Sequence, residues 1–209
     1  MLPTLFTKVM FLLVTCLSVS ALGVWLGRNI RSLGAVIGLG IAFFVGTFVV
    51  YFSATAAPPV AISLLLAWTL VSGLFMGPCI QGYSERIGWE GVFLCFTGTA
   101  GAMAVCGLIG MFSGVDFSGM STYLMFALFG LIIFGVVGIF VRMSRTVNII
   151  HAILGMVIFA GYFLFDFFRL TKGQDTWPEA VRMTMSLYLD FINFFLYLLQ
   201  LYAEISSKS

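Results

Sequence analysis

Long stretches without a charged side chain dominate this sequence, and residues 32–84 form the longest of them. A helix needs about 20 apolar residues to cross the hydrocarbon core of a bilayer, so this stretch alone has room for two crossings. Pro58 and Pro59 lie near its middle and indicate a turn there, because proline disrupts a helix interior. The chain is therefore predicted to be a multi-pass integral membrane protein.

The charged residues divide the rest of the chain into further apolar segments of similar length. The first segment resembles a signal peptide, but Arg28 and Arg31 stand where a small-residue cleavage site would be, so we expect it to remain as a span. The pattern predicts one transmembrane domain over residues 1–209, an all-α bundle of seven helices with spans at about 9–27, 33–53, 60–80, 91–113, 120–141, 146–166 and 180–203.

The composition excludes several classes of function. Hydrophobic residues make up 61% of the chain and charged residues 9%, which leaves no segment long enough for a water-soluble catalytic domain. The 10 Lys and Arg residues are scattered among 8 Asp and Glu residues, so no basic face is available for nucleic acid. His151 lies alone within a span, which is more typical of a packed residue than of a ligand. We expect neither an enzyme nor a bound cofactor.

The last predicted span carries a stripe of polar residues at helical spacing. Its members follow one another at intervals of three or four residues and share one helix face: Glu179, Arg182, Ser186, Asp190, Asn193, Tyr197, Gln200 and Glu204. Polar groups cannot be left unpaired in lipid, so this face must contact other helices or water. The stripe indicates either a bundle-centre helix held by hydrogen bonds or a polar path with Asp190 near its middle.

Asp166 ends the preceding span, where Phe167 and Phe168 continue the apolar run. An ionised aspartate at the centre of a span costs about 2.5–3.5 kcal/mol on insertion scales, so Asp166 and Asp190 each need a partner. They can be partners for each other. The alternative for Asp166 is an interfacial position with an ion pair to Arg169, three residues later.

If the two carboxyl groups meet, they can share one proton and titrate as a unit. When both are ionised, they offer the hard oxygen ligands that suit a calcium ion, and Asn193, Ser186 and backbone carbonyl groups could add to them. Protonation and cation binding would then compete at one site. Asp166 and Asp190 are therefore the predicted proton sensor and the predicted metal ligands.

Three sequence motifs are similar to those of the Bax inhibitor family, the transmembrane Bax inhibitor motif proteins. They are the run SLYLDFINFFLYLLQL from Ser186 to Leu201, the run YFLFD ending at Asp166, and SGLFMGP from Ser72 to Pro78. The resemblance implies a seven-helix bundle with the last helix central. It also implies a pH-sensitive calcium leak, as in bacterial members, or regulation of cell death and calcium, as in eukaryotic members.

By position, Asp166 and Asp190 resemble the aspartate pair of the family. In bacterial members the second helix supplies an arginine that latches onto one aspartate, whereas residues 32–84 here have no charge. The latch is therefore either absent or supplied by another residue, such as Arg169 or Arg182.

The expected function is a pH-sensitive calcium leak channel in a bacterial cytoplasmic membrane, with the lipid bilayer, calcium ions and protons as its partners. A non-conducting regulator of another membrane protein, such as a membrane protease, is the main alternative, because the polar stripe could be structural. An intramembrane aspartyl protease is a remote alternative, because the step from Leu187 to Asp190 lacks the Gly-x-Gly-Asp pattern of those enzymes.

Overall fold

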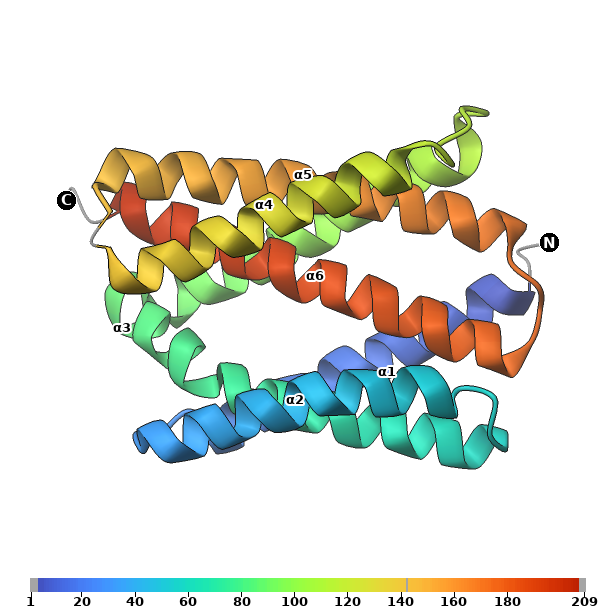
Figure 1. The fold of residues 1–209 in the computed structure, drawn as a ribbon, viewed down its shortest axis with the longest axis horizontal. Coiled ribbons are helices and arrows are strands. Elements are labelled where there is room, and N and C mark those ends of the chain that lie inside the picture. The colour runs from blue at the N-terminus through green and yellow to red at the C-terminus, as the bar shows by residue number, and fades with distance from the viewer. Residues whose placement is uncertain (1–3, 142, 207–209) are drawn as a thin grey trace. The chain divides into compact units, whose positions relative to one another are not determined.

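The computed structural model describes residues 4–141 and 143–206, without the side chain of Ile139, and is helical throughout its regular parts. The helices in chain order are α1 (Thr4–Gly27), α2 (Leu33–Ser53), α3 (Pro58–Phe112), α4 (Met120–Phe140), α5 (Arg145–Lys172) and α6 (Trp177–Ser206) (Figure 1). The described residues contain no strand. The predicted all-α class is confirmed.

Six helices in the described residues are long and apolar enough to cross a membrane, where seven were predicted. The difference arises in α3, which contains both the 60–80 range and almost all of the 91–113 range. Its 55 residues would extend about 80 Å as one straight helix, far more than the roughly 30 Å of the hydrocarbon core. Gly88 interrupts the helical backbone with φ 72° and ψ 162°, a conformation that favours glycine.

Local sequence signals explain where two of the helices begin. Ser32 precedes α2 with an extended backbone, and its hydroxyl accepts a hydrogen bond from the Ala35 amide. Pro58 is the first residue of α3, a position where the missing amide proton of proline costs nothing. Ser32 thus marks the start of α2. Pro58 marks the start of α3, so residues 54–57 connect α2 to α3.

The helices pack into two compact units. Unit 1 comprises the described residues up to Gly82 together with Gly173–Tyr188, and unit 2 comprises Tyr83–Lys172 together with the described residues from Leu189 onward. Helices α3 and α6 are each divided between the two units, so that one part of each helix belongs to unit 1 and the other part to unit 2. Of the six helices, α6 has the largest buried share and α2 the smallest.

Unit 1 is held together by a close approach of α1 to α3. A Cβ atom built on Gly77 would lie 2.7 Å from the carbonyl carbon of Gly27, and this distance is too short for any side chain at position 77. The small residues therefore bring the two backbones into contact, as is common between membrane helices. In the same unit, the buried Tyr188 hydroxyl is hydrogen-bonded to Ser20 Oγ at 2.7 Å and to Ser72 Oγ at 2.9 Å.

Unit 2 is built around the aromatic face of α6. Phe191 and Phe195 pack against Phe96 of α3 with ring centroids 5.2 and 6.0 Å apart, and Phe194 packs on Phe163 of α5. Helix α4 lies beside α5 (Figure 1).

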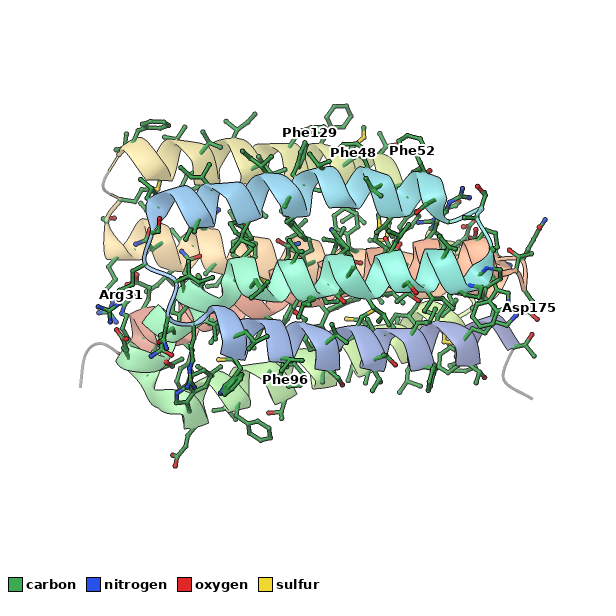
Figure 2. The ribbon with its side chains drawn as sticks, turned by 90° about the horizontal axis from the view of Figure 1, so that it is seen from below. Arg31, Phe48, Phe52, Phe96, Phe129 and Asp175 are labelled. Atoms are coloured by element: carbon green, nitrogen blue, oxygen red, sulfur yellow. The ribbon has the colours of Figure 1, made fainter. Side chains whose placement is uncertain are left out.

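The helices α2 and α4 present apolar side chains outward in their respective units. Phe48 and Phe52 of α2 and Phe129 of α4 are all more than half exposed (Figure 2). Such surfaces are unfavourable in water but suit the hydrocarbon of a bilayer. The exposure pattern therefore agrees with a multi-pass membrane protein.

The Tyr188 hydroxyl bridge should stabilise unit 1. We predict that Tyr188→Phe lowers the free energy of unfolding by about 1–3 kcal/mol, because Ser20 and Ser72 lose their shared buried partner. Equilibrium unfolding of the purified protein in mixed micelles would measure this. Tyr123→Phe is the matched control, since Tyr123 is 78% exposed and should change nothing. Equal effects of the two substitutions would contradict the prediction.

Asp175, in the connection between α5 and α6 (Figure 2), interacts with the start of α1 in unit 1. Its carboxylate accepts hydrogen bonds from Thr4 Oγ1 and, at 2.9 Å, from Lys8 Nζ, which also lies 5.0 Å from the Trp177 ring. These hydrogen bonds, with a smaller Coulombic attraction to Lys8, lower the pKa of Asp175 below its ordinary value.

A lowered pKa means that the ionised carboxylate favours the folded state above the ordinary pKa, about 3.9, and that this contribution is lost as the pH falls through the lowered value. We predict that carbon-13 NMR will give Asp175 a titration midpoint below that of a free aspartate, and that Lys8→Gln will move it upward. An unchanged midpoint in Lys8→Gln would show that Lys8 does not hold the carboxylate.

Candidate functional site

Asp166 and Asp190 meet inside unit 2. Asp166 lies on α5, which continues past it to Lys172, and Asp190 lies near the middle of α6. Their exposed fractions are 1% and 5%, so neither carboxyl group is at a water interface. The two groups lie close enough to interact electrostatically with each other. Two neighbouring carboxylates repel each other when both are ionised, so this arrangement favours one proton shared between them.

Arg169 provides the positive charge at this site. Its Nη1 atom lies 3.3 Å from Asp166 Oδ1, one turn along the same helix, and its side chain is 44% exposed. The guanidinium group also lies 5.5 Å from the Phe165 ring. The sequence left two partners open for Asp166, namely Asp190 and Arg169. The structure combines them, because this buried carboxyl group lies next to Asp190 and is also paired with Arg169.

Tyr162 is a neighbour of the pair that the sequence interpretation missed. It lies one turn before Asp166 on α5 and interacts electrostatically with both Asp166 and Asp190. Phe159 packs against its ring at 5.8 Å. The spacing of four residues between Tyr162 and Asp166 would have indicated a shared helix face. An aromatic shell with one hydroxyl group therefore borders the carboxyl pair.

The other predicted site residues are placed differently. Asn193 donates a hydrogen bond from Nδ2 to the Leu189 carbonyl oxygen at 2.8 Å, one turn back along α6. Ser186 and Arg182 belong to unit 1, where the Arg182 guanidinium lies 5.2 Å from the ring of Tyr51. Their support of the aspartate pair remains a prediction.

The described residues contain no group of three or more His, Cys, Asp or Glu side chains that could hold a metal ion. A calcium ion prefers six to eight oxygen ligands, whereas Asp166 and Asp190 supply two carboxyl groups, one of which is paired with Arg169. The pair alone therefore offers fewer oxygen ligands than a calcium ion prefers.

The comparisons with known proteins agree with this architecture. The family model described as "Inhibitor of apoptosis-promoting Bax1" matches residues 2–208. The chain belongs to the Bax inhibitor family. The resemblance read from the last two predicted spans is therefore confirmed at the level of the family.

Several relatives show the breadth of this family. An uncharacterized membrane protein of Streptococcus pyogenes serotype M1 is 28% identical over 175 residues, which cover 80% of this chain and 73% of the relative. Bax inhibitor 1 of Schizosaccharomyces pombe is 31% identical over 66% of this chain and 50% of its own length. A Golgi anti-apoptotic protein of vaccinia virus is 33% identical over 72% of this chain and 60% of its own length.

Infrared spectroscopy can test whether the pair shares a proton. We predict that infrared spectra of the purified protein, recorded across a pH titration, contain the carbonyl band of a buried protonated carboxyl group, and that Asp190→Asn removes it because the pair no longer exists. Asp116→Asn is the matched control, since Asp116 lies exposed between α3 and α4. A wild-type protein without this band, or a band that survives in Asp190→Asn, would contradict the assignment.

Proposed function

We propose that this Bax inhibitor family protein is a pH-sensitive calcium leak channel, with the Asp166–Asp190 pair as its proton sensor and cation site. The observation that carries the proposal is the burial of these two carboxyl groups within reach of each other's charge. Membership of the family supports it, because the resemblance noted above implies such a leak for bacterial members. The membrane would be a bacterial cytoplasmic membrane, and the role would not be enzymatic.

The charge balance at the pair explains how pH would act. With one shared proton, Asp166 and Asp190 carry one negative charge, and Arg169 balances it at 3.3 Å. Loss of that proton leaves a second negative charge in a buried aromatic environment, where it is costly unless another cation arrives. A calcium ion would neutralise this charge, because it is a divalent cation that binds carboxylate oxygens. Protons and calcium ions then compete for the same oxygens, which makes the flux depend on pH.

Arg169 would take the role that the second-helix arginine has in the bacterial members. It is the residue whose guanidinium is paired with Asp166, whereas Arg182 lies over Tyr51 in unit 1. Because Arg169 is only three residues from Asp166, this counter-charge moves with α5 itself. The pair would therefore be released by protonation or by calcium rather than by withdrawal of another helix.

The channel would have seven membrane passages, with α3 crossing twice. Gly88 interrupts α3, and Glu85, Arg86 and Glu90 lie around the interruption. Charged side chains favour the membrane surface over the hydrocarbon, so this segment suits a turn between two crossings. The most buried helix, α6, would be central, as its polar stripe requires.

Calcium flux into liposomes that contain only this protein tests the proposal. We expect a dye-reported flux that varies between about pH 6 and 8 in the wild type. The Asp166→Asn/Asp190→Asn variant should lose this pH dependence, and Asp190→Asn alone should lose most of it, because the shared proton is gone. Asp116→Asn should behave as the wild type does. An unchanged pH profile in the double variant would contradict the role of the pair.

A non-conducting regulator of another membrane protein is the second candidate function. It is favoured by the names of two relatives, Bax inhibitor 1 and Golgi anti-apoptotic protein, which describe inhibition rather than transport. The same liposome experiment separates the two candidates. No flux above that of empty liposomes at any pH would exclude the leak and leave the regulator.

A further inference from the structure

A cavity of about 330 Å³ lies in unit 2 at the junction of α4 and α5, and neither Asp166 nor Asp190 lines it. Its walls come from α4, the connection to α5, α5 itself and α6, through Phe134, Gly135, Gly138, Met143, Asn148, His151 and Gln200. This volume is at the lower end of the range of small-ligand sites. The cavity is near the end of α4, the start of α5 and the end of α6, the depth at which lipid headgroups meet a membrane protein.

The room in the cavity comes from α4, where two glycines replace side chains. A Cβ atom built on Gly135 would meet nothing within 4 Å, and one built on Gly138 would come no closer than 3.5 Å to Met143. Neither glycine has the positive φ that would require this residue type. Larger residues would be better helix formers at both positions, so the glycines do not serve the local fold of α4.

His151 contributes an unused hydrogen-bonding atom beside this cavity. Its ring packs between Phe134 at 4.7 Å and Tyr197 at 5.3 Å. Its Nε2 atom is buried and has no hydrogen-bond partner among the described residues. A buried polar atom without a partner costs free energy, and a bound ligand would remove that cost.

The other polar side chains of the cavity also have acceptor atoms to offer. Asn148 donates from Nδ2 to Glu204 Oε1 at 3.3 Å, and Gln200 donates from Nε2 to the Asn148 carbonyl oxygen at 3.4 Å. Each amide nitrogen thus makes one bond inside the protein, and each amide oxygen can accept a hydrogen bond from a ligand. A neutral imidazole adds an acceptor nitrogen, and the Phe134 ring adds the negative face of an aromatic system.

Among the described residues, Arg145 and Glu204 are the charged side chains beside this cavity. Arg145 donates from Nε to the Glu204 carbonyl oxygen at 2.9 Å, and its Nη2 atom contacts the same oxygen and that of Ile205. It thereby caps the negative end of the α6 dipole. The Glu204 carboxylate accepts from Asn148 and also lies 4.0 Å from Arg145 Nε. The acceptor atoms that the cavity presents are therefore those of His151, Asn148 and Gln200.

We propose that this cavity binds a primary ammonium group, either in the headgroup of an ethanolamine lipid or in a free amine. Such a group supplies N–H donors to His151 Nε2 and to the amide oxygens of Asn148 and Gln200, and its charge suits the face of the Phe134 ring. The outward face of α4 gives a membrane lipid a route to the site, because only 11% of the most apolar stretch of this helix is buried inside the protein.

The experiment compares lipids that differ only in their N–H donors. The full-length protein in detergent would be mixed with dioleoyl-phosphatidylethanolamine or with dioleoyl-phosphatidylcholine, and the lipid retained would be measured by native mass spectrometry. We expect about tenfold stronger retention of the ethanolamine lipid, because the choline headgroup carries no N–H donor. Equal retention of the two lipids overturns the lipid form of the proposal.

Two variants test whether the preference arises in this cavity. Gly135→Leu fills the space that the glycine leaves, and His151→Phe keeps an aromatic ring but removes Nε2. Both should reduce the preference to within about twofold. Gly130→Leu is the matched control, because Gly130 is on the same helix, also has nothing within 4 Å of a built Cβ, and does not line the cavity. A preference that persists in Gly135→Leu overturns the proposal.

A second measurement distinguishes a lipid from a free amine. If a free amine is the ligand, ethanolamine hydrochloride should raise the thermal midpoint of the wild type more than choline chloride does, and Gly135→Leu should abolish the difference. If the lipid is the ligand, the lipid preference appears without this effect of free ethanolamine. The absence of both effects excludes an ammonium site.

Discussion

Burying two carboxyl groups side by side is the constraint on which the rest of unit 2 depends. Asp166 and Asp190 lie in one apolar interior within reach of each other's charge, and Arg169 balances part of that charge at 3.3 Å from Asp166. The aromatic packing of α6 on Phe96 and Phe163 keeps water from the pair and so strengthens these interactions. Any change in the proton content of the pair must therefore be answered by a movement of charge or of helices.

Much of the fold could be predicted because charge is so scarce in this chain. The positions of Lys, Arg, Asp and Glu separate the apolar segments, and Ser32 and Pro58 indicate where α2 and α3 begin. The seventh helix is not confirmed as a separate element, for a local reason. The charged residues near Gly88 indicate a break, but they do not show that helical geometry resumes at once on both sides of a single residue.

The candidate site was predictable as far as it rests on spacing along helices. The expense of burying Asp166 and Asp190 pointed to a pair, and Arg169 was an expected partner. Spacing could not show that the Asn193 amide donates to the backbone of its own helix, a bond that competes with any contact to the pair. The cavity beside His151 could not be predicted from the sequence either, because it forms where Gly135 and Gly138 lack side chains.

The interruption of α3 at Gly88 also bears on how the chain reaches its membrane. An apolar helix of 55 residues cannot enter a bilayer as one rod, since it would extend far beyond both surfaces. If α3 crosses twice, as proposed above, Pro58–Phe112 would enter the membrane as two successive hydrophobic segments, with the polar residues around Gly88 at the interface. The backbone conformation of one glycine would then separate two steps of membrane insertion.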